Sequence, residues 1–200
     1  MTWIILGSVF LGILLGKIGF LSFLTINLDL VSGVCLNILL FTVGLDLGHN
    51  KEVWAKIKAF GWKVLLLPFS IALGSLLGAT VISLLISFPL NHGVAVGAGF
   101  GWYSLSGVML KELVNVELGT IAFLANVFRE MLAIILIPFV ALHFGRIAAV
   151  APGGATSMDT TLPLISKAAG ADVALMAFIS GAVLSCLVPI LVPFLVNLPF

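Results

Sequence analysis

Charged side chains are scarce in this chain. Only 8% of its 200 residues are Asp, Glu, Lys or Arg, whereas 62% are hydrophobic. Water-soluble domains carry about 25% charged residues, so this composition cannot cover a globular core with a polar surface. The formal net charge is +1, and no basic run with interleaved aromatic residues is present. The sequence therefore predicts an integral membrane protein and excludes nucleic acid as a partner.

Cysteine is also rare. Cys35 and Cys186 each lie within an apolar stretch, without a second thiol or a histidine at the spacing of metal ligands. A free cysteine in such a stretch behaves as a small hydrophobic residue, so we expect both thiols to be buried. The sequence predicts neither a metal site nor a disulfide framework, and we expect no cofactor.

Long apolar runs are abundant instead. A helix needs about 20 apolar residues to cross the ~30 Å hydrocarbon layer of a membrane. Runs of this length predict an all-α integral membrane protein with one transporter domain over 1–200. The five predicted spanning helices cover about 2–24, 29–47, 62–87, 117–142 and 172–197.

Two further segments, about 93–113 and 148–168, are rich in Gly, Ala, Ser and Thr. They contain the helix-breaking sequences Gly-Phe-Gly at 99–101 and Pro-Gly-Gly at 152–154. Because unpaired backbone groups cannot face lipid, non-helical chain at membrane depth must lie within protein or line a cavity. We predict two re-entrant hairpins that enter from opposite faces, as in transporters built from inverted repeats. If both segments crossed completely, the chain would have seven crossings.

The basic residues predict the orientation. Lys51, Lys56, Lys58 and Lys63 form the densest positive cluster of the chain. Cytoplasmic loops are enriched in Lys and Arg, so the loop over 49–63 is predicted to be cytoplasmic. We therefore expect a multi-pass protein of the cytoplasmic (inner) membrane.

Glu130 lies near the middle of the apolar run 117–142. An acidic residue at the centre of a spanning helix costs ~2.5 kcal/mol or more, so it is expected to face protein or water and to have a function. Asn126 lies four residues earlier, on the same helical face. We predict that both side chains bind substrate and that Glu130 exchanges protons. The alternative is a structural contact between Arg129 and Glu130, but adjacent helical residues do not face one another.

Polar residues of the two glycine-broken segments complete the predicted site. Thr156, Ser157 and Asp159 follow the Pro-Gly-Gly sequence, where a half-helix would direct its N-terminal amides at an anionic group. The alternative is that one of these side chains only caps that helix. Asp159 is the second candidate for proton exchange. The other segment supplies four predicted substrate-binding residues, Trp102, Tyr103, Ser104 and Ser106.

Three ordered sequence runs resemble the LysO-type family of lysine exporters. They are FGWYSLSG at 100–107, Asn126 together with Arg129 and Glu130, and GATSMDTTLP at 154–163. The resemblance covers essentially the whole chain, but full-length members carry an additional N-terminal membrane portion that this sequence lacks. Some members are divided into a short and a long polypeptide, and this chain resembles the long one. We therefore expect a short membrane subunit or a homo-oligomer as partner.

The resemblance also bears on the acidic residues. Members of the family are thought to rely on a pair of intramembrane carboxylates. Glu130 matches the one in the C-terminal portion, whereas the other would lie in the additional N-terminal portion. Either a partner protein supplies the second carboxylate, or Asp46 or Asp159 replaces it.

The function that the resemblance implies is export of L-lysine, with close cationic analogues as an extension. Because expelling a cation against an inside-negative potential costs ~2.3 kcal/mol per 100 mV, we predict proton antiport as the coupling. Such a protein is a transporter and not an enzyme. The first alternative is a cation-coupled carrier of small organic anions. The second is an intramembrane serine protease with Ser106 as nucleophile, which requires a histidine base, whereas His92 and His143 both lie at segment ends.

Overall fold

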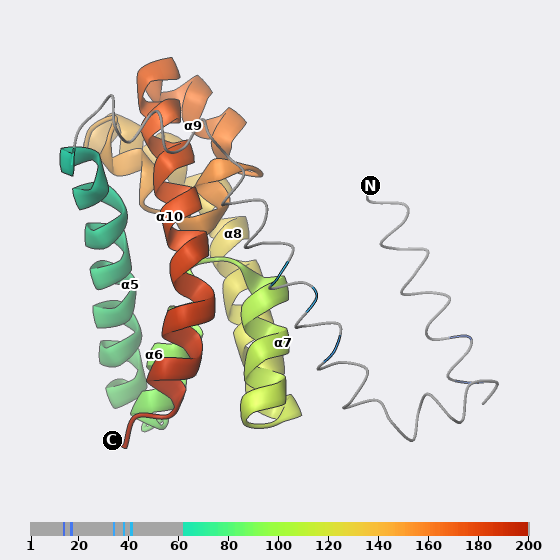
Figure 1. Ribbon diagram of the computed structural model, residues 1–200. Coiled ribbons are helices and arrows are strands. Elements are labelled where there is room, and N and C mark those ends of the chain that lie inside the picture. The colour runs from blue at the N-terminus through green and yellow to red at the C-terminus, as the bar shows by residue number, and fades with distance from the viewer. Residues whose placement is uncertain are drawn as a thin grey trace. The chain divides into compact units, whose positions relative to one another are not determined.

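The computed structural model describes residues 62–199, together with the single residues Leu14, Lys17, Val34, Ile38 and Phe41. The chain forms two compact units, Met1–Leu39 and Leu40–Phe200, and residues 62–199 belong to the second. Every regular element within 62–199 is a helix (Figure 1). The predicted all-α class is confirmed.

Three helices of the described range are long and apolar enough to cross a membrane. They are α5 (Leu66–Leu85), α8 (Val116–His143) and α10 (Ala171–Val196). Their bounds overlap the last three spans predicted from the sequence, and together they identify a multi-pass membrane protein. The predicted spans 2–24 and 29–47 lie almost wholly outside the described residues, as does the loop 49–63. The total of five spans therefore remains a prediction.

Two groups of short elements connect the long helices. Between α5 and α8 lie α6 (Leu90–Gly97) and α7 (Tyr103–Leu113). Between α8 and α10 lie η2 (Ala148–Val150), η3 (Gly154–Met158) and α9 (Leu162–Ala169), and η1 (Trp62–Leu65) precedes α5. None of these elements reaches the length of a membrane span. Whether the two groups re-enter or cross remains a prediction.

Local sequence explains where several helices begin. Asn115 caps α8, because its side-chain oxygen accepts a hydrogen bond from the backbone N–H of Leu118 at 2.8 Å. Glu117 follows in the first turn, where a negative charge complements the helix dipole. At the start of α10, Gly170 adopts a φ of +95°, so the chain reverses sharply between α9 and α10.

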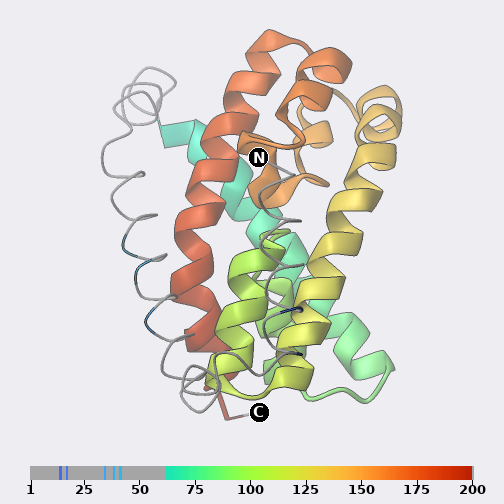
Figure 2. The ribbon, with the colours of Figure 1, turned by 90° about the vertical axis from the view of Figure 1, so that its right-hand side faces the viewer.

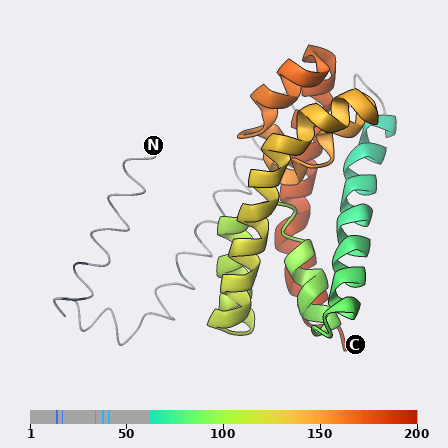
Figure 3. The same cartoon turned by 180° about the vertical axis from the view of Figure 1, so that it is seen from behind.

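Helix α10 forms the centre of this unit. It packs against η3, α9, α6 and α7, whereas α7 packs against α8 (Figure 2) and α5 against α6. Half of its most apolar stretch is buried, compared with 22% for α5 and for α8. Figure 3 shows α5 and α8 on the outside of the unit, where large side chains such as Phe69 and Phe128 are exposed. Exposed apolar faces on apolar helices are typical of contact with lipid.

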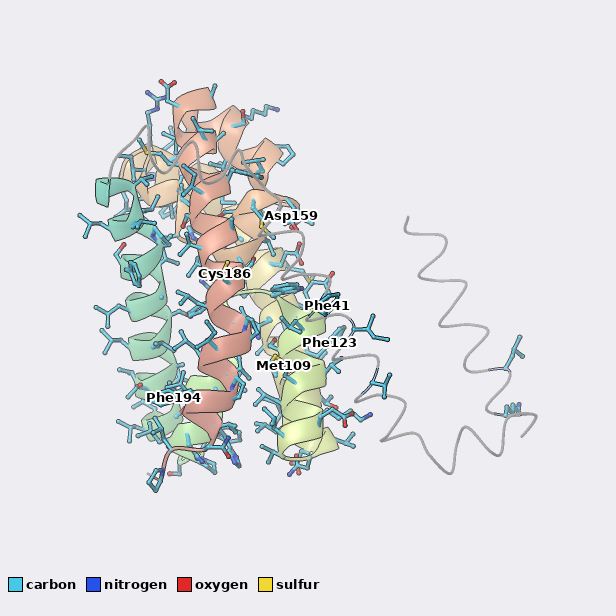
Figure 4. The ribbon with its side chains drawn as sticks, in the orientation of Figure 1. Phe41, Met109, Phe123, Asp159, Cys186 and Phe194 are labelled. Atoms are coloured by element: carbon cyan, nitrogen blue, oxygen red, sulfur yellow. The ribbon has the colours of Figure 1, made fainter. Side chains whose placement is uncertain are left out.

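The expectation of a buried thiol is wrong for Cys186, which is exposed on α10 (Figure 4). The reason is that α10 is apolar around its whole circumference, so its sequence carries no periodic signal to separate an inner from an outer face. Cys35 lies outside the described residues.

Candidate functional site

The two glycine-broken segments meet inside the unit. The backbone N–H of Ala155 donates a hydrogen bond of 2.8 Å to the carbonyl oxygen of Phe100, a fully buried residue. Gly154 has a φ of +58°, and a Cβ at that position would collide with the same carbonyl oxygen. Close approach of the two segments therefore requires glycine at position 154. Two stretches about 50 residues apart in the sequence thus form one junction.

Asn126 holds the first segment in place. Its side-chain oxygen accepts a hydrogen bond of 2.7 Å from the backbone N–H of Gly101. Its amide nitrogen donates to the carbonyl oxygens of Val96 and Ala122 and lies 3.3 Å from the hydroxyl of Ser106. The side chain is 3% exposed, so these bonds satisfy an amide that would be costly to bury alone. The structure therefore places Asn126 as a brace between α8 and the turn before α7.

Hydroxyl groups hold the second segment. The Ser157 hydroxyl lies within 2.8 Å of the carbonyl oxygens of Gly154 and Ala177, which connects η3 to α10. The Thr156 hydroxyl donates to the carbonyl oxygen of Gly153 at 2.8 Å. Gly181 of α10 has no side chain, and a Cβ there would meet the backbone of Met158. These contacts fix η3 against α10 without using either carboxylate of the predicted site.

Thr160 connects the two predicted proton-exchanging residues. Its hydroxyl donates a hydrogen bond of 2.6 Å to the carboxylate of Glu130, and its backbone N–H donates to the carboxylate of Asp159 at 2.5 Å. Asp159 is exposed and lies at the margin of the helical bundle (Figure 4), whereas Glu130 is half-buried. Neither carboxylate forms an ion pair with a basic side chain of residues 62–199. The structure thus brings to one threonine two acids that have no basic partner in the described range.

Arg129 faces a different neighbour from Glu130. Its guanidinium donates a hydrogen bond of 2.8 Å to the hydroxyl of Ser75, which in turn donates to the carbonyl oxygen of Gly97. Ser75 and Arg129 both lie at the midpoint of their helices, α5 and α8. An arginine at the centre of a spanning helix costs about 2.5–3.5 kcal/mol on insertion scales, so a functional role is expected. The same sequence signal that identifies Glu130 could have identified Arg129, which was not among the predicted site residues.

The remaining predicted residues lie around the start of α7. Trp102 and Tyr103 are half-buried, and the Tyr103 ring packs edge-on against Phe123 at 5.4 Å. The buried Ser106 hydroxyl donates to the carbonyl oxygen of Trp102 and contacts Asn126. Ser104 is exposed and lines a separate hollow of about 360 Å³ between α7 and α8. Ser106 therefore lies beside Asn126, whereas Ser104 lies at the separate hollow between α7 and α8.

The arrangement around Ser106 does not resemble that of a serine nucleophile. No histidine of the described range hydrogen-bonds to its hydroxyl, and His143 contacts the carbonyl oxygen of Phe139 instead. Among residues 62–199 there is also no group of three His, Cys, Asp or Glu side chains that could hold a metal ion. This arrangement can bind an organic ion, because it combines two acids, the guanidinium of Arg129 and buried amides.

The chain is similar to known proteins over most of its length. The model of the family described as "Lysine exporter LysO" matches residues 6–196. The protein named "Lysine exporter LysO" in Escherichia coli is 36% identical over 188 residues, which are 94% of this chain and 62% of that protein. A relative in Haemophilus influenzae, whose name also refers to a lysine exporter, is 36% identical over 161 residues, 80% of this chain and 82% of its own length. No solved structure matches the chain.

Proposed function

Because the chain belongs to the lysine exporter LysO family, we propose that it exports L-lysine across the cytoplasmic (inner) membrane. The family is one of transporters, and the three long apolar helices agree with that role. The chain spans 62% of the length of its Escherichia coli relative. We therefore propose that a short membrane subunit or a second copy completes the transporter.

The pairing of Glu130 and Asp159 through Thr160 carries this proposal. Two carboxylates without a basic partner among the described residues attract an organic cation, and L-lysine has two ammonium groups. Hydrogen bonds between an ammonium and a carboxylate are charge-assisted and about twice as strong as neutral ones. The acids lie next to the junction of the broken segments, where transporters commonly place their substrate. Direct binding by the other predicted residues belongs to the same proposal: Trp102, Tyr103, Ser104, Ser106, Asn126, Thr156 and Ser157.

Proton antiport is the coupling that we propose. Moving a cation outward against an inside-negative potential costs ~2.3 kcal/mol per 100 mV, so passive export of lysine is disfavoured. A carboxylate can hold a proton or pair with an ammonium group, but it does not do both at once. Exchange of the two at Glu130 and Asp159 would release lysine when a proton arrives from outside.

Replacing Glu130 by Gln tests this mechanism. Glutamine has a similar shape but neither the charge nor the exchangeable proton, so we expect efflux of labelled lysine from proteoliposomes to fall at least about 100-fold. Glu117→Gln is the matched control, because Glu117 is an exposed acid in the first turn of the same helix. We expect it to retain wild-type efflux. Equal efflux from both variants would remove Glu130 from the mechanism.

A carrier of small organic anions is the second candidate, and Arg129 favours it because a guanidinium binds carboxylates. Thermal shift measurements with L-lysine and with small dicarboxylates separate the two. We expect stabilisation by lysine alone. Stabilisation by dicarboxylates and not by lysine would replace the first proposal with the second.

A further inference from the structure

A cavity of about 650 Å³ lies between α5, α6 and α8. Ligand sites typically have volumes of about 300–1,000 Å³. Most of the residues that line it are apolar or small, including Gly78, Ile82, Val96 and Ile121. Of the lining residues in the described part of the chain, only Arg129 is charged. The cavity therefore combines an apolar wall with a single positive charge.

Among residues 62–199, the guanidinium of Arg129 uses only part of its hydrogen-bonding capacity. It carries five N–H donors, of which one is directed to the Ser75 hydroxyl. No carboxylate of residues 62–199 lies within ion-pair distance of it, and the neighbouring Glu130 bonds to Thr160 instead. A charged group in an apolar setting needs a counterion, and an arginine inside a membrane protein commonly marks a substrate path.

The surroundings orient this guanidinium. The Ser75 hydroxyl gives its proton to the carbonyl oxygen of Gly97, so its oxygen remains free to accept from Arg129. The guanidinium also lies against the junction, because a Cβ added at Gly154 would be 3.0 Å from its second terminal nitrogen. Six residues further along the same segment, Thr160 contacts Glu130. One segment, 154–160, thus borders both Arg129 and Glu130 of α8.

We propose that Arg129 recognises the carboxylate of the transported amino acid. A guanidinium can bind a carboxylate through two parallel N–H bonds, which gives both strength and orientation. An α,ω-diamino acid carries this carboxylate at one end and an ammonium group at the other. In this arrangement the carboxylate binds to the guanidinium of Arg129, and an ammonium group pairs with the acids beside Thr160. This inference rests on the proposed function and extends it, because the acids alone cannot distinguish L-lysine from a simple diamine.

Competition between L-lysine and 1,5-diaminopentane tests the inference, because the diamine lacks only the carboxylate. Both compounds compete with labelled lysine for the 200-residue chain in detergent. We expect the wild type to prefer lysine roughly tenfold or more, the loss expected when a charge-assisted bond is removed. Arg129→Gln should bring the ratio of the two affinities close to one. Arg129→Lys keeps the charge without the planar fork, so its ratio should be intermediate.

The outcomes separate the inference from the proposed function. An unchanged ratio in both arginine variants overturns the role of Arg129, while the proposed export of lysine stands. A wild-type protein that binds neither compound overturns both. If Arg129→Gln loses a phospholipid that co-purifies with the wild type and keeps the wild-type ratio, the guanidinium binds a lipid phosphate, and the inference is wrong.

A matched pair of glycines tests whether the cavity itself is used. Gly74 and Gly78 both lie in α5, and a Cβ at either position meets no atom within 4 Å. Only Gly78 lines the cavity. We expect Gly78→Leu to lower lysine efflux roughly tenfold by filling this space, whereas Gly74→Leu should have no effect. Equal efflux from the two variants would show that lysine does not enter the cavity.

Discussion

The two broken segments are fastened by different means. The first turn, at 99–101, is held by one side chain of α8, the amide of Asn126, which bonds to atoms before, within and after the turn. The second, at 152–154, is held by backbone contacts and by the Ser157 hydroxyl against α10. Only the second carries a carboxylate without a basic partner among residues 62–199, that of Asp159, whereas Glu112 of the first pairs with Lys111 at 3.6 Å. The first segment is thus fixed by a side chain of α8, whereas the second presents charge.

The substitution with the largest expected effect breaks the contact between the two segments. Gly154→Ala forces a left-handed alanine and pushes its Cβ against the Phe100 carbonyl, so we expect the free energy of unfolding to fall by about 3 kcal/mol. Gly145→Ala is the control, because Gly145 has a φ of +99° but open space around it. It should cost only about 1 kcal/mol. Unfolding of both variants by SDS in mixed micelles measures the difference, and equal losses would mean that the contact does not matter.

Removing the brace of the first segment should have the next largest effect. Asn126→Ala leaves the buried N–H of Gly101 without an acceptor, so we expect a loss of about 2 kcal/mol in the same unfolding experiment. Ser104→Ala, in the same segment but exposed, should change stability little. If Asn126→Ala abolished lysine binding at wild-type stability, Asn126 would bind the substrate, as proposed, without stabilising the turn.

The sequence predicts some features of the two segments and not others. Apolar runs and glycine-rich breaks predict long and short helices because bilayer thickness and backbone geometry impose them locally. Glu130 stands out because a charge in an apolar run is rare. The contact of Phe100 with Ala155 could not be predicted, since helical spacing gives the angle between side chains of one helix but not the neighbours that they meet. For the same reason, the cavity beside Arg129 has no signal in the sequence.

The smallest expected effect concerns the charged end of the second segment. Thr160→Val keeps the shape of the side chain but removes the hydroxyl that donates to Glu130, so this carboxylate is no longer held beside Asp159. Thr160 is exposed, and stability should therefore change little. We expect lysine efflux to fall about tenfold, which corresponds to about 1.4 kcal/mol in the activation free energy of transport.

Thr120→Val supplies the control for this last substitution. Thr120 is an exposed threonine of α8 whose hydroxyl donates only to the carbonyl oxygen of Val116 in its own helix. Its replacement should leave efflux unchanged. If the two valine variants export lysine equally well, the two carboxylates do not need Thr160 to act together. If Thr160→Val instead unfolds as readily as Gly154→Ala, the outer end of the second segment is a structural support like the first, and the comparison between the two segments fails.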